Sequence, residues 1–154
     1  MKIMKFGGTS VGKPERMQQI VSLVSKEAEP VIVVLSALSG TTNALVEIGN
    51  HIANGDRSTA KQTIDKLEKH YQDFISELVK QPATSEKAKA IVTEHFEFLN
   101  IILKISFSEA LSKDILAQGE LLSTKIFSVY LEELGVDHLF LPALEFMTID
   151  HYDE

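Results

Sequence analysis

A short segment near the start of the chain combines the residue types that bind phosphate. Residues 5–12 read Lys-Phe-Gly-Gly-Thr-Ser-Val-Gly, between a short apolar run and a proline. The adjacent Gly7 and Gly8 have no Cβ, so the backbone can turn sharply there and bring successive N–H groups close to an anion. Two hydroxyl donors and one ammonium complete the set: Thr9, Ser10 and Lys5. We therefore predict a phosphate-binding loop, with Lys5 as the group that stabilises phosphate charge.

The segment that follows the loop supports this prediction. A helix is expected over residues 13–26, with Pro14 in its first turn, where the missing N–H is no loss. The positive end of its dipole would face the glycine loop. The alternative is a strand-to-helix turn that needs small residues and binds nothing. The pattern matches neither Gly-x-Gly-x-x-Gly nor the Walker form, so it predicts neither a Rossmann dinucleotide site nor a P-loop.

Two strands must position this loop. Residues 2–6 read as a first strand, and residues 30–37 as a second that is apolar on both faces. A run buried on both sides indicates a parallel sheet covered by helices. The loops at Gly7 and at residues 36–42 would then follow the carboxyl ends of the strands, where ligands sit in open α/β sheets.

Three blocks of the sequence resemble one family. Residues 5–11 resemble the N-terminal signature of aspartate kinases, within the amino acid kinase superfamily, and two further blocks fit in order: Val-Leu-Ser-Ala-Leu-Ser-Gly-Thr-Thr-Asn at 34–43 and Gly119-Glu120. The resemblance covers nearly the whole chain. The sequence departs from the family where Leu-Pro-Ala-Leu stands at 141–144 in place of Leu-Asp-Ala-Arg, and where Leu121 follows Glu120 in place of an Arg.

The resemblance implies a transferase. It implies transfer of the γ-phosphoryl group of ATP to the side-chain carboxylate of L-aspartate, the first step of lysine, threonine and methionine biosynthesis, with Mg²⁺ carried by the nucleotide. It also implies a homo-oligomer. The implied fold is an α/β three-layer αβα sandwich with a mainly parallel sheet, here incomplete, because residues 1–154 would form only the N-terminal part of a kinase domain. We therefore expect this chain alone to be inactive.

The resemblance also assigns roles to residues. Lys5 is the catalytic residue; the nucleotide contacts are Lys5, Gly7, Gly8, Thr9, Ser10 and Ser36; the amino acid contacts are Thr42 and Glu120. Without the resemblance, Thr42 reads equally well as a helix N-cap and Glu120 as an exposed helix glutamate. Gly119 lies within a helical pattern, where glycine is about 1 kcal/mol less favourable than alanine, which indicates a close approach by another element.

The middle of the chain predicts a helical excursion at about residues 58–104. After a helix over 42–53 that stops at Asn54-Gly55, serines at positions 58 and 85 are expected to cap two long helices separated by Pro82. This excursion would overhang the site as a lid or supply a subunit interface. Ser112 is expected to cap a further helix that closes at Gly135, and residues 136–141 to form a third strand.

The composition of the chain argues against several classes of protein. The net charge of −7, with 22 acidic side chains and no basic stripe, argues against nucleic-acid binding. No segment approaches the ~18 apolar residues of a membrane span, and residues 1–6 are too short for a signal peptide. The absence of Cys fits a cytoplasmic protein. The five histidines have no metal-ligand spacing, so we expect surface or boundary positions for them and no metal site.

Two other functions remain open from the sequence. The chain could belong to another member of the superfamily, acting on glutamate, acetylglutamate or a nucleotide. It could also be a non-catalytic binding or assembly module that retains the phosphate loop. The Ser-Gly-Thr-Thr-Asn block and Gly119-Glu120 favour aspartate.

Overall fold

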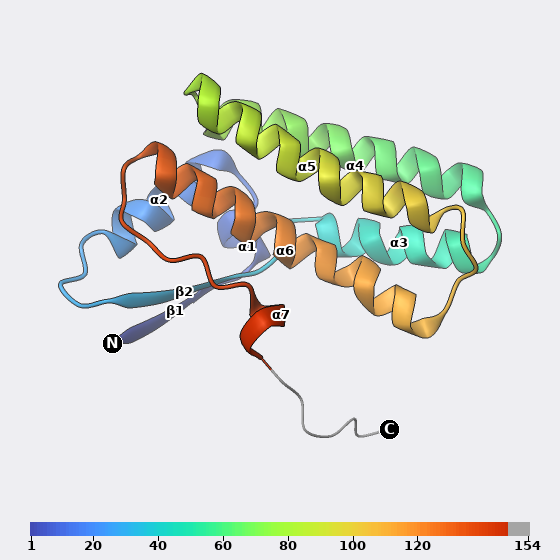
Figure 1. Cartoon of the computed structure of the whole chain (residues 1–154), viewed down its shortest axis with the longest axis horizontal. Coiled ribbons are helices and arrows are strands. Elements are labelled where there is room, and N and C mark those ends of the chain that lie inside the picture. Colours follow the sequence, from blue (N-terminus) through green and yellow to red (C-terminus); the bar gives the residue numbers. More distant parts are fainter. Residues whose placement is uncertain (148–154) are drawn as a thin grey trace.

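The chain begins with a strand-helix-strand unit. In the computed structural model, which describes residues 1–147, strands β1 (Lys2–Phe6) and β2 (Val31–Leu35) pair in parallel, with Phe6 opposite Leu35 at the carboxyl ends. The connection contains a one-turn helix, α1 (Gly8–Val11), and the longer α2 (Pro14–Val24). Both strands are short, and β2 consists of apolar, mostly β-branched residues, which favour strands. A parallel pair needs a crossover such as this helical one to bring the chain back to the start of the sheet. The predicted unit is confirmed (Figure 1).

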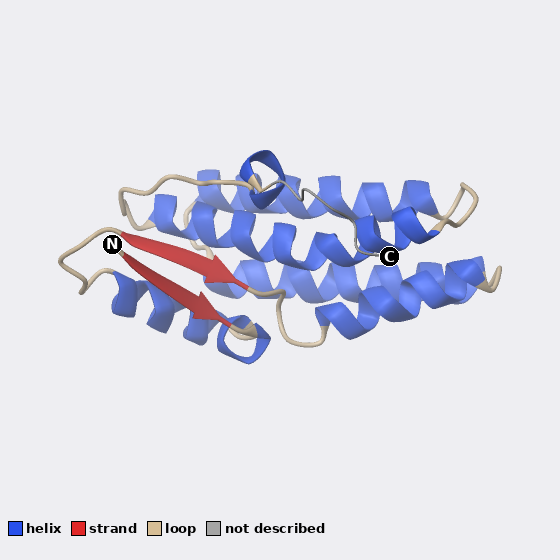
Figure 2. Cartoon of the chain, turned by 90° about the horizontal axis from the view of Figure 1, so that it is seen from below, coloured by secondary structure: helices blue, strands red, loops and turns tan. Residues whose placement is uncertain are grey.

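Four longer helices form the rest of the core. They are α3 (Thr41–Ala53), α4 (Arg57–Leu78), α5 (Pro82–Ile102) and α6 (Glu109–Glu133). Helix α3 contacts α4, α4 contacts α5, α5 contacts α6, and α6 contacts α3, so they close a four-helix bundle. The bundle lies at one end of the sheet, as the view from below shows (Figure 2). It joins the sheet through contacts of α6 with β2 and of α2 with α4.

The helical excursion is therefore part of the core. The apolar side chains of α4 recur every three or four residues and form one buried face: Ala60, Ile64, Leu67, Tyr71, Phe74, Ile75 and Leu78. This face packs on α3 and α5. Helix α4 is therefore packed between two helices of the bundle. It does not overhang the loops that follow β1 and β2 as a lid. No helix within the described residues is apolar enough over a sufficient length to cross a membrane.

Several predicted helix starts are wrong. Asp56, not Ser58, caps α4 by accepting a hydrogen bond from the Thr59 N–H. Ser108, not Ser112, caps α6. Helix α5 starts at Pro82, three residues before the expected Ser85. The predicted ends are correct, since α3 and α6 stop before Gly55 and Gly135, which have φ of +77° and +66°.

The sheet is smaller than the sequence indicated. Residues 136–141 form no strand, and the described part of the chain contains only the two strands. This segment pairs with neither β1 nor β2 and leads to the one-turn helix α7 (Ala143–Phe146). The parallel α/β character of the predicted fold is nevertheless confirmed.

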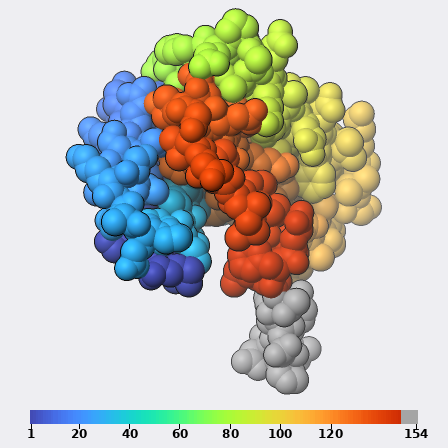
Figure 3. Space-filling model, turned by 60° about the vertical axis from the view of Figure 1, so that its left-hand side comes forward, coloured from blue at the N-terminus to red at the C-terminus, as the bar shows by residue number. Residues whose placement is uncertain are grey.

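One face of the sheet is open. Ile3, Ile32 and Val34 are 66%, 41% and 42% exposed, so the expectation that the second strand is buried on both faces is wrong. Helix α2 covers the opposite face, on which Phe6 and Val33 pack against the core. In the space-filling view a notch separates the N-terminal part of the chain from the segment that follows α6 (Figure 3).

Candidate functional site

The glycine loop forms a tight turn at the end of β1. Gly7 is the N-cap of α1, and its carbonyl accepts the N–H groups of Ser10 and Val11 at 2.8 and 3.3 Å. The N–H groups of Gly8 and Thr9 come before these, in the first turn, where a helix provides no intrahelical acceptor. The donors next to the turn thus belong to α1, whereas the sequence predicted that they would belong to the helix that follows Lys13.

The loop after β2 lies directly on the glycine loop. A Cβ on Gly8 would lie 3.0 Å from the Ala37 carbonyl oxygen, and one on Gly12 only 2.5 Å from the Ser39 Cβ. The N–H of Ser36 also donates to the Phe6 carbonyl, at 3.0 Å. These glycines are needed because two backbone segments meet at the carboxyl edge of the sheet.

Helix α6 approaches the second loop just as closely. A Cβ on Gly119 would lie 2.7 Å from the Ala37 Cβ and 3.2 Å from the Thr41 Cγ2. The prediction that this glycine allows a close approach is confirmed. Next to it, a Glu120 carboxylate oxygen accepts the Ala37 N–H at 3.4 Å.

A serine on the next turn of α6 fixes the start of the same loop. The Ser123 hydroxyl donates to the Ser36 carbonyl at 2.8 Å. Ser123 is fully buried. The sequence reasoning gave it no role, although its spacing from Gly119 places both on one face of α6.

Three separate parts of the sequence thus meet at one place. The glycine loop, residues 36–42 and the Gly119-Glu120 turn of α6 come together where both strands end (Figure 1). The predicted site residues there are either exposed, as Lys5, Gly7, Thr9, Ser10, Thr42 and Glu120 are, or half-buried, as Gly8 and Ser36 are.

Thr42 does not cap a helix. Helix α3 begins at Thr41, its N-cap is Gly40 with φ of +84°, and no side chain caps it by a hydrogen bond. The N-cap interpretation of Thr42 is therefore wrong. Thr42 is exposed in the first turn of α3, while Thr41 beside it is buried.

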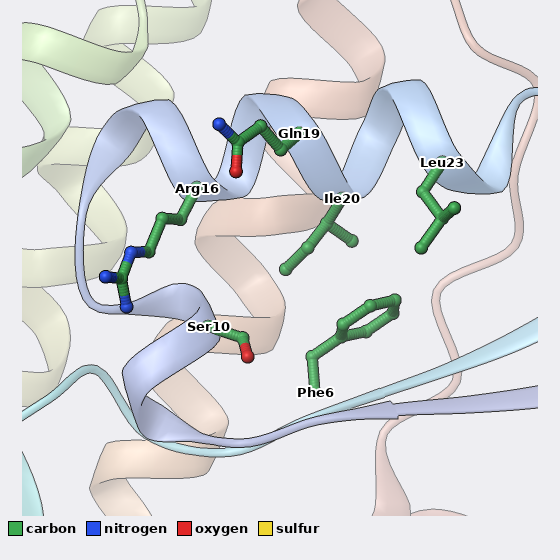
Figure 4. Close-up of a pocket in the computed structure, with 6 residues that line it drawn as sticks. All are labelled: Phe6, Ser10, Arg16, Gln19, Ile20 and Leu23. Carbon is green, nitrogen blue, oxygen red and sulfur yellow. The ribbon is translucent and has the colours of Figure 1, made fainter.

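The structure separates two residues that the sequence grouped. Ser10 lines a hollow of about 310 Å³ together with Phe6, Arg16, Gln19, Ile20 and Leu23 (Figure 4). This hollow lies on the α2 side of β1. Lys5 and Phe6 are consecutive in the strand, so their side chains leave it on opposite faces. Lys5 therefore leaves β1 on the face away from the Ser10 hydroxyl.

A cation that the sequence reasoning missed lies on the glycine loop. The Arg16 guanidinium, in the first turn of α2, donates to the Thr9 carbonyl. Its only signal in the sequence was a basic residue in the first turn of the helix after the loop. Arg16 stabilises the loop by this contact and adds positive charge beside it.

One histidine is buried, contrary to expectation. His95 is 5% exposed, whereas His51, His70 and His138 are half-buried or exposed as predicted, and His151 lies outside the described residues. The Lys125 ammonium donates to His95 Nε2 at 2.9 Å, so His95 Nδ1–H donates to the Gln118 amide oxygen at 2.6 Å. Burial, and next the charge of Lys125, lower the pKa of His95, so the ring is neutral in this pair of contacts.

Comparison with known proteins identifies the family. The sequence pattern described as "Amino acid kinase family" matches residues 1–153. The chain belongs to this family. The Arabidopsis thaliana protein "Aspartokinase 2, chloroplastic" is 35% identical over 97% of the chain, and the Escherichia coli "Lysine-sensitive aspartokinase 3" is 31% identical over 87% of it.

Solved structures agree with this assignment. The crystal structure of E. coli aspartokinase III in complex with aspartate and ADP (R-state) matches 88% of the chain with a TM-score of 0.69 and 27% identity. The complex of the same protein with lysine and aspartate (T-state) matches 89% with a TM-score of 0.72 and 26% identity. The chain spans only 29% and 30% of those chains, and 28% and 29% of the two curated relatives.

Proposed function

We propose that this chain is the phosphate-loop and amino-acid-binding part of an aspartate kinase. The reaction is transfer of the γ-phosphoryl group of MgATP to the side-chain carboxylate of L-aspartate, giving 4-phospho-L-aspartate. One observation carries this proposal: the glycine loop, residues 36–42 and Gly119-Glu120 meet at the carboxyl edge of a parallel sheet. The similarity to aspartokinases supports aspartate as the substrate.

The residues at this edge suit the chemistry. A carboxylate with a pKa near ~3.9 is already ionised at neutral pH, so the acceptor needs no general base. The reaction needs instead two anions held in line and charge stabilisation of the transferring phosphoryl group. In this proposal Lys5 supplies the positive charge, and the first N–H groups of α1, at Gly8 and Thr9, hold phosphate oxygens.

The glycine loop fits a nucleotide phosphate on structural grounds. The first N–H groups of α1 and the exposed Thr9 lie at a turn whose close packing excludes larger residues at Gly8. Mg²⁺ fits less well as a protein-held ion, because no group of three His, Asp or Glu side chains within residues 1–147 is arranged to hold a metal. We therefore assign Mg²⁺ to the nucleotide phosphates.

Glu120 is the proposed partner of the substrate α-ammonium. Within the described residues, its carboxylate makes a single hydrogen bond, to the Ala37 N–H at the long distance of 3.4 Å. A carboxylate has about four acceptor positions, so most of those of the exposed Glu120 are open to a ligand. An ammonium group near the exposed side of Glu120 would supply up to three donors and an opposite charge.

Other parts of the proposal concern the whole protein. The ATP site would be completed by residues beyond this segment, so we propose that the 154-residue chain alone lacks kinase activity. Cytoplasmic location and homo-oligomer formation are part of the same proposal. The lack of Cys supports the first, and the open sheet face, which an added chain would cover, is compatible with the second.

The test is substrate-specific kinetics of the complete protein that contains this segment. We expect ATP-dependent phosphorylation of L-aspartate, and no comparable rate with L-glutamate or acetylglutamate. Glu120→Gln should raise the KM for aspartate at least ~10-fold, the scale for losing an ionic partner, and leave the KM for ATP within about twofold. Glu47→Gln, on the exposed face of α3, is the matched control. Preference for another acceptor would replace aspartate kinase by a different family member, and nucleotide binding without turnover would indicate a binding module.

A further inference from the structure

A buried tyrosine from the helical excursion contacts the loop that carries the predicted amino-acid ligand. Tyr71, on α4, is 0% exposed, and its hydroxyl lies 3.1 Å from the Thr41 hydroxyl, itself 1% exposed. Thirty residues separate the two along the chain. Because both side chains are buried, this hydrogen bond satisfies polar groups that would be costly to leave unpaired.

The same hydroxyl lies near the loop before Thr41. The hydrogen bond with Thr41 and the nearby backbone of Leu38 both act to lower the pKa of Tyr71. Burial outweighs both and raises the pKa of Tyr71 far above its usual value, and the negative charge of Glu120 raises it further. The phenol therefore stays protonated, and its hydrogen bond holds the first residue of α3.

Thr41 is held from two sides. The Tyr71 hydroxyl contacts its hydroxyl, and the backbone of α6 at Gly119 contacts its methyl group, since a Cβ there would lie 3.2 Å from the Thr41 Cγ2. The ring of Tyr71 is fixed as well, because it packs on Phe96 with centroids 5.9 Å apart. The start of α3 is thus clamped between α4 and α6.

We propose that Tyr71 is a positioning residue for the acceptor amino acid. Its hydroxyl fixes Thr41, and thereby places Thr42 and the turn from Leu38 at the distance from Glu120 that aspartate requires. The proposal rests on the proposed function and deepens it, because it gives the α4–α5 hairpin a role in substrate affinity. Tyr71 does not touch the substrate, so its effect passes through Thr41.

The first experiment removes the hydroxyl and keeps the ring. In the complete protein, Tyr71→Phe should raise the KM for L-aspartate roughly 3- to 10-fold, the factor that corresponds to one hydrogen bond, with the KM for ATP within about twofold. Tyr130→Phe is the matched control, because Tyr130 is a buried tyrosine of α6 outside this contact. It should leave both KM values unchanged. Equal increases for both substrates, or a lower Tm with unchanged KM values, would overturn the proposal.

A second variant tests whether the Tyr71 and Thr41 hydroxyls act through each other. Thr41→Val keeps the shape of the side chain and removes its hydroxyl, so it should shift the aspartate KM in the same direction. The double variant should be no worse than the more affected single variant, because both remove one interaction. Additive effects would show that the two hydroxyls act independently and would overturn the positioning role.

A readout without substrate separates this proposal from the proposed function. Backbone amide hydrogen exchange in Tyr71→Phe should become faster at residues 37–42 and stay unchanged in β1 and α5. If the protein phosphorylates another acceptor but this local loosening occurs, aspartate specificity fails while the clamp stands. Unchanged exchange at residues 37–42 would reject the clamp whatever the substrate.

Discussion

The four-helix bundle and the two-stranded sheet differ in how completely their own contacts cover their apolar and polar side chains. Each helix of the bundle contacts two others, and several of its buried polar side chains are paired, as in Thr41 with Tyr71 and His95 with Gln118. The sheet is covered on one face only, with Ile3, Ile32 and Val34 exposed on the other. The candidate site lies between these two regions.

The difference indicates that the two regions have different roles. The bundle is closed by its own contacts, so it can serve as a rigid support for the loops at its end. The sheet presents an apolar face and unpaired strand edges, which are features that further chain or another protein covers. We therefore expect substitutions at the exposed edge to affect activity with little effect on stability, and substitutions in the bundle to affect stability first.

The largest expected effect is at the sheet end. In the complete protein, Lys5→Ala should lower kcat at least ~10²-fold, the scale for losing one preorganised charge-stabilising group. The Tm should change little because Lys5 is exposed. Lys2→Ala, on the same strand but ion-paired with Glu27, is the control and should retain kcat. Unchanged turnover in Lys5→Ala would remove Lys5 from the site.

At Gly119, where α6 meets the loop after β2, we expect a substitution to affect both stability and substrate binding. Gly119→Ala places a Cβ 2.7 Å from that of Ala37, so α6 must move away from the loop. We expect a loss of about 1–3 kcal/mol in the free energy of unfolding, as for overpacked cores, and weaker aspartate binding. Urea unfolding and aspartate titration measure the two effects.

A second glycine provides the control for Gly119. Gly49 is also a buried, mid-helix glycine, but a Cβ there would meet no atom within 4 Å. Gly49→Ala should therefore stabilise the protein, by up to about 1 kcal/mol, through helix propensity alone. If both substitutions had the same sign, the close approach at Gly119 would not be the cause.

Within the bundle, Glu133→Ala tests a helix cap from a distant part of the chain. Glu133, on α6, accepts the N–H groups of Lys80 and Gln81 and the Thr84 hydroxyl at 2.6–3.0 Å, and so caps α5. Its removal should lower the free energy of unfolding by about 1–2 kcal/mol. Glu132→Ala, which loses only a surface ion pair with Lys87, should change it by less than about 0.5 kcal/mol.

The same carboxylate gives a pH dependence. Burial alone would raise the pKa of Glu133, but the hydrogen bonds from Thr84, Lys80 and Gln81 together lower it. Its contribution to stability is therefore present above the unfolded pKa and is lost as the pH falls through the folded pKa. Acid unfolding of Glu133→Ala should be less steep in that range, and identical curves would contradict the capping role.

The smallest effect is expected from His95. Because burial and Lys125 lower its pKa, the unfolded chain takes up the proton at a higher pH than the folded chain. Stability should be complete above ~6.5, the unfolded pKa, and should decrease as the pH falls below it. Urea unfolding at about pH 7.5 and about pH 5.5 measures this. His95→Gln should flatten the dependence and His70→Gln, on an exposed face, should not.

The comparison of the two regions also explains where sequence reasoning succeeded. The helices of the bundle have strong apolar periodicity, and their ends at Gly55 and Gly135 follow from positive φ, so both were predictable locally. The double glycine and Gly119 were recognisable because glycine is unfavourable unless a close contact requires it. The family of the chain followed from these same short blocks.

Several features that the sequence failed to predict depend on contacts between distant segments of the chain. The start of α5 had a local signal, Pro82 at the first helical position, which was interpreted only as a break between helices. The carboxylate of Glu133 that binds this start, about fifty residues away, could not be read from the local sequence. Residues 136–141 have the composition of a strand but pair with neither β1 nor β2, and such pairing depends on the position of a distant segment. The clamp of Tyr71 on Thr41 looked like ordinary core packing, since a hydroxyl facing another helix leaves no periodic signal.

The sequence by itself determined the two strands, the long helices and the three blocks that carry the candidate site, because backbone freedom, helix propensity and apolar spacing act over a few residues. Only the tertiary structure decided which side chains meet. It placed Lys5 and Ser10 on different sides of β1, brought Glu120 to the Ala37 N–H, and closed Tyr71 onto Thr41. These relations depend on the direction in which each element leaves the sheet, and such directions are fixed by packing between distant segments.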